Sequence, residues 1–259
     1  MLASVSLFRR EQVYILSTLS VLVVGAWIYL YRLTLNMPAM DMSQMSVVAV
    51  VKPYMKPWTT MDFFLMFIMW LVMMFGMMVP TVMRAALIFS GIARKAKGQG
   101  YVVAPTFIFV SGYVVIWSLY SVVATVAQWR LTQAALLSPM MVSSSDVLGA
   151  ILLVSAGIYQ LTPIKNICLK HCQQPFQFLS KAFQKNHGAF HAGIIHGAYC
   201  LGCCWVLMGL LFVVGVMNLL WAFSITLFVL WEKSILSSMV VSKMSGLLMI
   251  CFGLVYIII

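Results

Sequence analysis

The sequence predicts an all-α bundle that crosses a membrane about seven times. Of the 259 residues, 63% are hydrophobic and only 8% are charged, a composition unlike that of a soluble globular domain. Several apolar runs approach the ~20 residues that a helix needs to cross a bilayer. Basic residues gather in the short segments between these runs, as they do in the loops that orient membrane proteins. We therefore expect one integral membrane domain over residues 1–259, surrounded by a lipid bilayer.

The predicted spans are apolar runs bounded by charged, proline-rich or glycine-rich segments. They cover residues 12–33, 60–83, 104–129, 147–163, two helices within 197–231, and 244–259. The 197–231 run is too long for one helix across ~30 Å of hydrocarbon, so we place a hairpin turn near Asn218. Pro80 should kink or end the second span, because proline removes a helical hydrogen bond.

Charge asymmetry between the connecting segments predicts the orientation. Arg9, Arg10 and the segments 84–97, 165–185 and 233–243 put most basic residues on one side, and the positive-inside rule makes that side cytoplasmic. The N-terminus is then cytoplasmic, residues 36–58 form a Met-rich extracytoplasmic loop, and residues 164–192 form a cytoplasmic loop. The first apolar run lacks a small-residue cleavage site, so we expect no cleaved signal peptide.

The charged residues argue against several functions. The net charge of +11 could suggest nucleic acid, but no basic stripe with interleaved aromatics stands apart from a span, so we expect no nucleic-acid partner. Asp62 begins the second span, where a negative charge favours the positive end of a helix. The SSSD stretch ending at Asp146 is typical of a helix N-cap. Glu232 lies beside Lys233, and we interpret the two as an ion pair, with a proton or ion relay as the alternative.

Methionine is concentrated in one part of the chain. Thirteen of the 21 methionines lie within residues 37–83. Met37, Met40, Met42 and Met45 alternate with polar residues in the predicted outer loop, and Met66, Met69, Met73 and Met77 share one face of the second span, with Met74 and Met78 beside that face. Thioethers are soft donors that suit Cu(I), although a Met-rich linker and adaptable helix packing would give the same pattern.

Five of the six cysteines lie in two short motifs. CLKHC contains Cys168, His171 and Cys172, and HGAYCLGCCW contains His196, Cys200, Cys203 and Cys204. Span four ends near the first motif and span five begins near the second, so both lie at the same membrane surface and can meet. If the second motif is helical, His196, Cys200 and either Cys203 or Cys204 share one face.

Four explanations for this clustering compete. Structural disulfides are disfavoured, because the inner side of the membrane is reducing. Four thiolates suit a tetrahedral zinc site, and they suit copper equally well, with the methionines elsewhere in the chain favouring copper. Inert apolar packing is the remaining alternative. We find no catalytic triad, no phosphate loop and no paired carboxylates at catalytic spacing, so nothing here resembles a hydrolase or kinase, and we favour a non-enzymatic role over an enzyme.

Three features of the chain are typical of one family: the segment AGIYQLTPIKNICLKHC, the segment HGAYCLGCCWVLMGLLFVVGVMNLLWAFSITLFVLWEK, and the pattern Trp70–Met73–Met74–Met77–Met78–Pro80. In these features the chain resembles a bacterial family of integral membrane proteins that is described as metal-binding by prediction and whose function is unknown. The resemblance covers roughly residues 61–233. The chain departs from the family pattern at Gln173, where a basic residue is usual, and at Phe75, where a small residue is usual. Neither departure removes a candidate ligand. The resemblance implies metal binding and a bacterial inner-membrane location.

These observations predict a membrane protein that binds a soft metal, copper first and zinc as the alternative. It would transfer Cu(I) or deliver it to a membrane cuproenzyme. Met37, Met40, Met42 and Met45 would capture the ion, Met69, Met73 and Met77 would pass it inward, and the cysteines would hold it. A non-catalytic accessory subunit of a monooxygenase or respiratory oxidase is the second interpretation, and a membrane oxidoreductase is the third.

Overall fold

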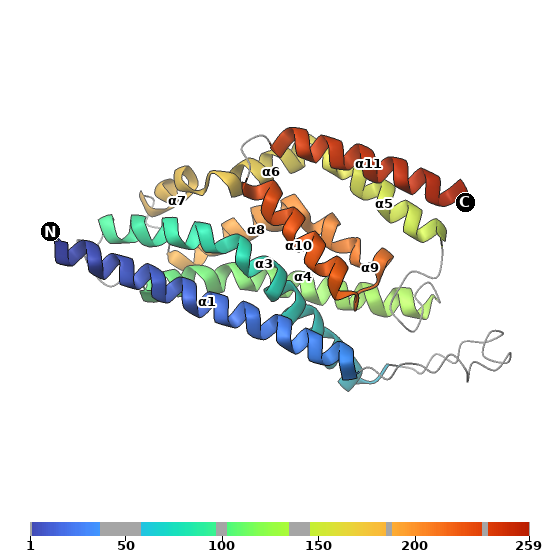
Figure 1. The fold of residues 1–259 in the computed structure, drawn as a ribbon, viewed down its shortest axis with the longest axis horizontal. Helices are drawn as coiled ribbons and strands as arrows, with labels where there is room; N and C mark the ends of the chain where they lie inside the picture. The colour runs from blue at the N-terminus through green and yellow to red at the C-terminus, as the bar shows by residue number, and fades with distance from the viewer. Residues whose placement is uncertain are drawn as a thin grey trace.

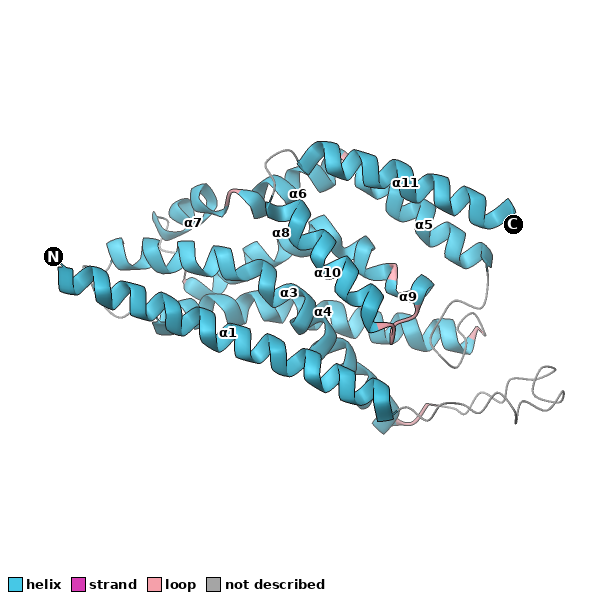
Figure 2. Ribbon diagram, in the orientation of Figure 1, coloured by secondary structure: helices cyan, strands magenta, loops and turns pink. Residues whose placement is uncertain are grey.

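The computed structural model describes residues 2–36, 58–96, 103–134, 146–184, 188–234 and 238–258. Within these residues the chain is helical apart from short turns, and Figure 2 shows no strand among them. In chain order the helices are α1 (Leu2–Asn36), α3 (Thr60–Ala96), α4 (Val103–Gln133), α5 (Asp146–Leu161), α6 (Pro163–Gln173), α7 (Pro175–Gln184), α8 (Ala189–Gly209), α9 (Leu211–Val214), α10 (Leu219–Ser234) and α11 (Ser238–Ile258). The predicted all-α bundle is confirmed.

Five segments of the described chain are long and apolar enough to cross a membrane. They are formed by α1, α3, α4, α8 with α9, and α11, and the bent pair α5–α6 makes a sixth if it counts as one span. The helix α10 occupies the place of the remaining predicted span, but its 16 residues are fewer than the ~20 of a full crossing. The structure therefore supports five or six spans of the seven that we predicted.

The helices form a bundle with α1 along one side and the α5–α11 pair along the other, as Figure 1 shows. Between them lie α3, α4, α8 and α10. The helices α4 and α8 approach so closely that a Cβ atom at Gly193 would collide with the carbonyl oxygen of Phe109. Glycine at this position lets the two backbones touch, and this close contact brings the middle of α8 against Tyr113 of α4.

The helix α3 continues through Pro80 and does not end there, contrary to one of our two expectations. Proline has no N–H to donate to the carbonyl four residues earlier, which here belongs to Gly76. The indole Nε1 of Trp27, on α1, donates to that carbonyl at 3.3 Å and satisfies it. Figure 1 shows α3 changing direction along its length, as expected for a proline kink.

The segment expected to be a basic loop, 164–192, is mainly helical. The helix α5 ends at Leu161 and α6 begins at Pro163, and the two meet at an angle of 66°. Thr162 is extended, as residues before proline usually are, and its hydroxyl caps α6 by accepting from the Lys165 amide. The Thr162–Pro163 break therefore turns the chain and points α6 across the bundle, where Cys168 and Cys172 meet α8.

Two local predictions are confirmed at helix ends. Asp62 lies in the first turn of α3 and forms a capping box with Thr59: its carboxylate accepts from the Thr59 amide at 2.8 Å, and the Thr59 hydroxyl accepts from the Asp62 amide at 3.4 Å. The chain turns just before α10, where Gly215 has a φ of 97° and the Asn218 side chain accepts from the Trp221 amide at 3.4 Å. The predicted hairpin near Asn218 is therefore present. The three serines of the SSSD stretch lie outside the described residues, and α5 begins at its aspartate, Asp146.

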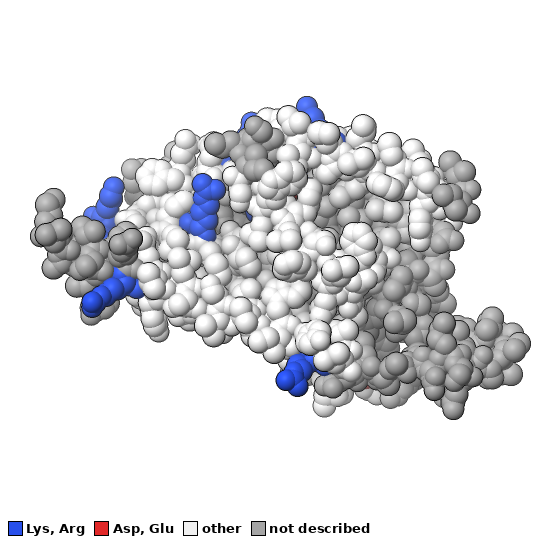
Figure 3. All heavy atoms as spheres, viewed as in Figure 1, with Lys and Arg blue, Asp and Glu red and all other residues white. Residues whose placement is uncertain are grey.

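The described surface is largely apolar, as a bilayer requires. Large hydrophobic side chains are exposed on α1, α10 and α11, including Val21, Leu220, Leu247 and Phe252. On the face in Figure 3, a broad area without Lys or Arg covers the middle of the molecule, and most basic side chains lie toward the N-terminal end and the rim. This arrangement fits contact with lipid.

Candidate metal centre

The structure brings the two cysteine motifs together. Cys172 on α6 lies with its Sγ atom 3.9 Å from the Sγ atom of Cys203 on α8. The thiol of Cys168, one turn earlier on α6, faces Gly202, where an added Cβ atom would lie 2.9 Å from its sulfur. All five thiols of the two motifs are free, and Cys200, Cys203 and Cys204 are buried. The predicted convergence of α6 and α8 is therefore present.

The separation of Cys172 and Cys203 fits two sulfurs on one ion. Sulfurs bound at about 2.3 Å lie about 3.8 Å apart in tetrahedral geometry and about 4.0 Å apart in trigonal geometry. Among the described residues, no three His, Cys, Asp or Glu side chains already form a complete metal-binding set. The thiols of Cys203 and Cys204 instead donate to the Cys200 carbonyl oxygen, each at 3.0 Å. A complete site would need rotation of these thiols away from the backbone.

Cys200 lies at the centre of a polar cluster that the sequence did not predict. The Nζ atom of Lys233, on α10, donates to the Cys200 sulfur at 2.9 Å. The Tyr113 hydroxyl, on α4, lies 3.0 Å from the same sulfur, and the Thr81 hydroxyl, on α3, lies 3.8 Å from it. Four helices thus contribute to the surroundings of Cys200, which places it at the junction of the bundle.

The two histidines of the motifs lie in different environments. His196 is buried on α8, one turn before Cys200, and packs between the rings of Phe109 and Tyr113, with centroids 5.8 and 6.0 Å away. His171 on α6 stacks flat on Tyr199, with ring centroids 4.1 Å apart, and its Nδ1 atom lies 3.0 Å from a backbone carbonyl. The structure therefore places His196 beside the thiols and His171 against an aromatic ring.

The methionines of α3 are buried inside the bundle. Met69, Met73 and Met77 are at most 3% exposed, and Met74 and Met78 are fully buried as well. The Met66 sulfur accepts a hydrogen bond from Gln128 at 3.7 Å. Met37, Met40, Met42 and Met45 lie outside the described residues. The methionine face predicted for the second span is therefore turned toward the protein interior.

Our prediction of an ion pair between Glu232 and Lys233 is wrong. Adjacent residues on a helix point in directions about 100° apart, so their side chains diverge. Glu232 instead binds the Nζ atom of Lys165, on α6, at 2.6 Å in a fully buried pair, while Lys233 turns toward Cys200. One feature of the sequence could have indicated the role of Lys233. It is a lysine at the end of an apolar helix, where a charged side chain needs a buried partner.

The family comparison bears directly on this geometry. A model of the PpoB2 family, described as a copper chaperone, matches residues 67–256 of the chain. The chain belongs to the PpoB2 copper chaperone family. The matched PpoB2 region contains α4 to α10 and most of α3 and α11, and so includes both cysteine motifs, Lys233 and the methionines from Met69 onward. It leaves out Met37 to Met45. No curated protein and no solved structure matches the chain.

Membership of the PpoB2 family supports a copper-related function and copper as the bound metal. It also agrees with the resemblance to a metal-binding family that we found in the sequence. That resemblance covers roughly residues 61–233, and the family model matches residues 67–256. The thiols and thioethers that the structure gathers are the soft donors that Cu(I) prefers.

Proposed function

We propose that this protein holds Cu(I) within the membrane and delivers it to a copper-using membrane enzyme. The observation that carries the proposal is the convergence of Cys168 and Cys172 with the α8 cysteines, including the 3.9 Å approach of Cys172 to Cys203. Membership of a copper chaperone family supports copper as the cargo. Cys168, Cys172, Cys200 and Cys203 are the proposed holding residues, with Cys204 and His196 next to them.

The methionines supply a route to this site. Met66 to Met78 span about 18 Å of α3 at the rise of an α-helix. Thr81, which follows Met78 by less than one turn, lies 3.8 Å from the Cys200 sulfur. The inner end of the methionine row therefore borders the cysteines. In this proposal Met37, Met40, Met42 and Met45 capture Cu(I) outside the cell membrane, and Met69, Met73 and Met77 pass it inward.

Lys233 suits a site that must release its metal. Its ammonium group donates to the Cys200 sulfur at 2.9 Å and lies 4.0 Å from the Cys204 sulfur. An ammonium and Cu(I) carry the same charge, so Lys233 gives the thiols a partner when copper has left. A carrier with an alternative partner for its ligands releases its cargo at a lower cost than one whose ligands are left unpaired.

The test is the metal content of the detergent-purified, full-length protein after anaerobic loading with Cu(I) or Zn(II). We expect bound copper in the natural sequence and a loss of most of it when Cys168, Cys172, Cys200 and Cys203 are all changed to serine. Zinc loading should leave less metal bound than copper loading, because thioethers add nothing to zinc binding.

Cys251→Ser is the matched control, because Cys251 is an exposed cysteine on α11, away from the two motifs. It should retain the copper content of the natural sequence. Equal copper content in the four-serine variant and in the control would overturn the proposal. A preference for zinc over copper would overturn the choice of cargo.

A further inference from the structure

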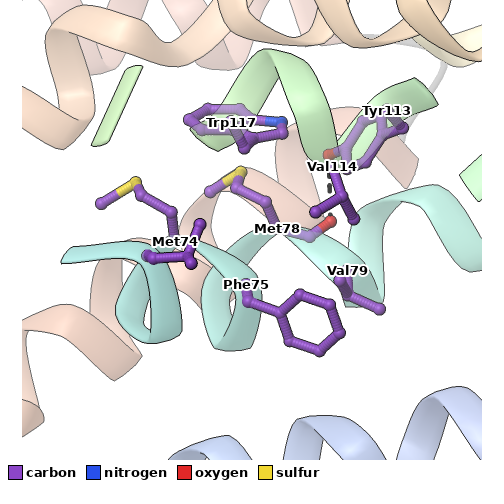
Figure 4. Close-up of a pocket in the computed structure, with 8 residues that line it drawn as sticks. Met74, Phe75, Met78, Val79, Tyr113, Val114 and Trp117 are labelled. Carbon is purple, nitrogen blue, oxygen red and sulfur yellow. Dashed lines mark hydrogen bonds between the residues drawn. The ribbon is translucent and has the colours of Figure 1, made fainter. Parts of the chain in front are cut away.

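A small cavity lies between α3 and α4. It borders Met74 and Met78, two methionines of α3 that the proposed route does not use. It has a volume of about 10 Å³ and is lined by Met74, Met78, Tyr113 and Trp117, and otherwise by apolar residues. Figure 4 shows that the sulfur atoms of Met74 and Met78 lie on the side of α3 that faces the Trp117 ring. Two thioethers one helical turn apart thus face one aromatic ring across a void.

The chemistry of this lining suits a soft monovalent cation. Thioethers are ligands for Cu(I), and Trp presents the most electron-rich aromatic face for a cation. Met74 and Met78 are both 0% exposed, so an ion here would be shielded from water. The volume is close to that of one water molecule and excludes a hydrated ion or an organic ligand.

Packing alone explains the lining poorly. The Nε1 atom of Trp117 is buried and has no hydrogen-bond partner among the described residues, although buried donors are nearly always paired. Phenylalanine, a smaller apolar ring, would line the cavity without this unpaired donor. The property that tryptophan adds is its larger, more electron-rich face, which is the property a bound cation uses.

The cavity also lies next to the cysteines. Tyr113 lines it, and the Tyr113 hydroxyl both donates to the Met78 carbonyl at 3.0 Å and lies 3.0 Å from the Cys200 sulfur. One side chain therefore separates the cavity from Cys200. An ion leaving the thioethers would need only Tyr113 to move in order to reach a thiol.

We propose that Met74, Met78 and Trp117 form a second Cu(I) site, a transit position directly before the cysteines. This site rests on the proposed function, since it gives the copper route a defined stop next to Cys200. It assigns a ligand role to two methionines outside the row Met69, Met73 and Met77.

The experiment titrates Ag(I), a soft ion with the same charge as Cu(I), into the detergent-purified full-length protein. Bound silver is measured after gel filtration, and tryptophan emission is followed in parallel. We expect the double variant Met74→Leu, Met78→Leu to bind about one ion fewer than the natural sequence, because leucine keeps the volume and removes the sulfur. The matched control changes Met239 and Met244, which are exposed on α11, to leucine and should bind the full number.

The emission change assigns the ion to Trp117. Trp117→Phe should reduce the silver-dependent quenching, whereas Trp221→Phe, at an exposed tryptophan on α10, should leave it unchanged. Equal stoichiometry in the Met74/Met78 variant, the control and the natural sequence would overturn the proposal and leave the cavity to a water molecule. Quenching of undiminished size in Trp117→Phe would overturn it too.

The four-serine variant distinguishes silver bound at this thioether site from silver bound at the cysteine site. With Cys168, Cys172, Cys200 and Cys203 changed to serine, the thioether site should still bind silver, and adding the two leucines should lower the bound silver by about one further ion. If the four-serine variant binds none while the natural sequence does, the thioether site is wrong and the cysteine site stands. If the four-serine variant binds as much as the natural sequence, the cysteine site is wrong. The stoichiometry in the cysteine-intact protein decides the transit site even if the four-serine variant does not fold.

Discussion

At the scale of single residues, the chemistry of the site depends on what surrounds Cys200. Its sulfur contacts an ammonium group from Lys233 and a hydroxyl group from Tyr113. Groups that contact a metal ligand orient it and change its basicity, and losing one typically lowers metal affinity by about 10- to 100-fold. Tyr113 lies next to both proposed sites, because its hydroxyl contacts the Cys200 sulfur and its side chain lines the cavity beside Met78.

We predict that Tyr113→Phe weakens Cu(I) binding by about 10- to 100-fold while the ring keeps its packing. Competition with a chromophoric Cu(I) chelator measures the affinity. The matched control is Tyr120→Phe, since the Tyr120 hydroxyl donates to the Trp205 carbonyl and not to a thiol. Equal affinities for the two variants would show that the contact of Tyr113 with Cys200 does not matter for binding.

At the scale of elements, the site depends on how α6 is held against α8. The Thr162–Pro163 break directs α6 across the bundle, and Gly202 allows it to come close. The Lys165–Glu232 pair and a hydrogen bond from the Gln173 side chain to the Glu232 carbonyl fasten both ends of α6 to α10. Because α10 also carries Lys233, this attachment fixes the position of the α6 cysteines relative to Lys233, which donates to the Cys200 sulfur.

Gly202→Ala should lower copper affinity without removing a sulfur. The new methyl group would lie 2.9 Å from the Cys168 sulfur, so that thiol must move away from α8. Gly209→Ala, on the same helix, meets nothing within 4 Å and should bind copper normally. The same chelator competition compares the two. If Gly202→Ala retains full affinity, Cys168 does not take part in the site.

The buried pair makes a prediction about stability. Glu232→Gln leaves the Lys165 ammonium buried without its carboxylate and should cost about 3–5 kcal/mol. Glu11→Gln removes the partner of Arg94 in a more exposed pair, at 11% and 15% exposure, and should cost less than about 1 kcal/mol. Thermal unfolding in detergent measures both. Replacing Lys165 and Glu232 together with methionine should recover most of the loss, and equal losses for Glu232→Gln and Glu11→Gln would contradict the structural role.

At the scale of the whole molecule, the sequence predicted the helical bundle and the meeting of the two cysteine motifs, because hydropathy and the order of spans determine both. It did not predict that 163–184 is helical, since charged residues at span ends look like loop residues in a sequence. It also missed Lys233, Tyr113 and Thr81, which reach Cys200 from three other helices. Such contacts depend on helix rotation and close packing, which one sequence does not show.

Orientation remains a prediction of the positive-inside rule, and fusion reporters test it. A fluorescent protein that folds only in the cytoplasm should be active when joined to the N-terminus. A phosphatase that needs the extracytoplasmic side should be active when inserted within residues 36–58. The reverse pattern would place the Met-rich loop in the cytoplasm and would exclude it as an external copper-capturing site.

The most direct test of the central claim is X-ray absorption at the copper edge on the Cu(I)-loaded, full-length protein. The account predicts that sulfur atoms dominate the first shell of neighbours and that changing Cys168, Cys172, Cys200 and Cys203 to serine removes the thiolate contribution. A first shell made mainly of nitrogen and oxygen, or a spectrum unchanged in the four-serine variant, would contradict it.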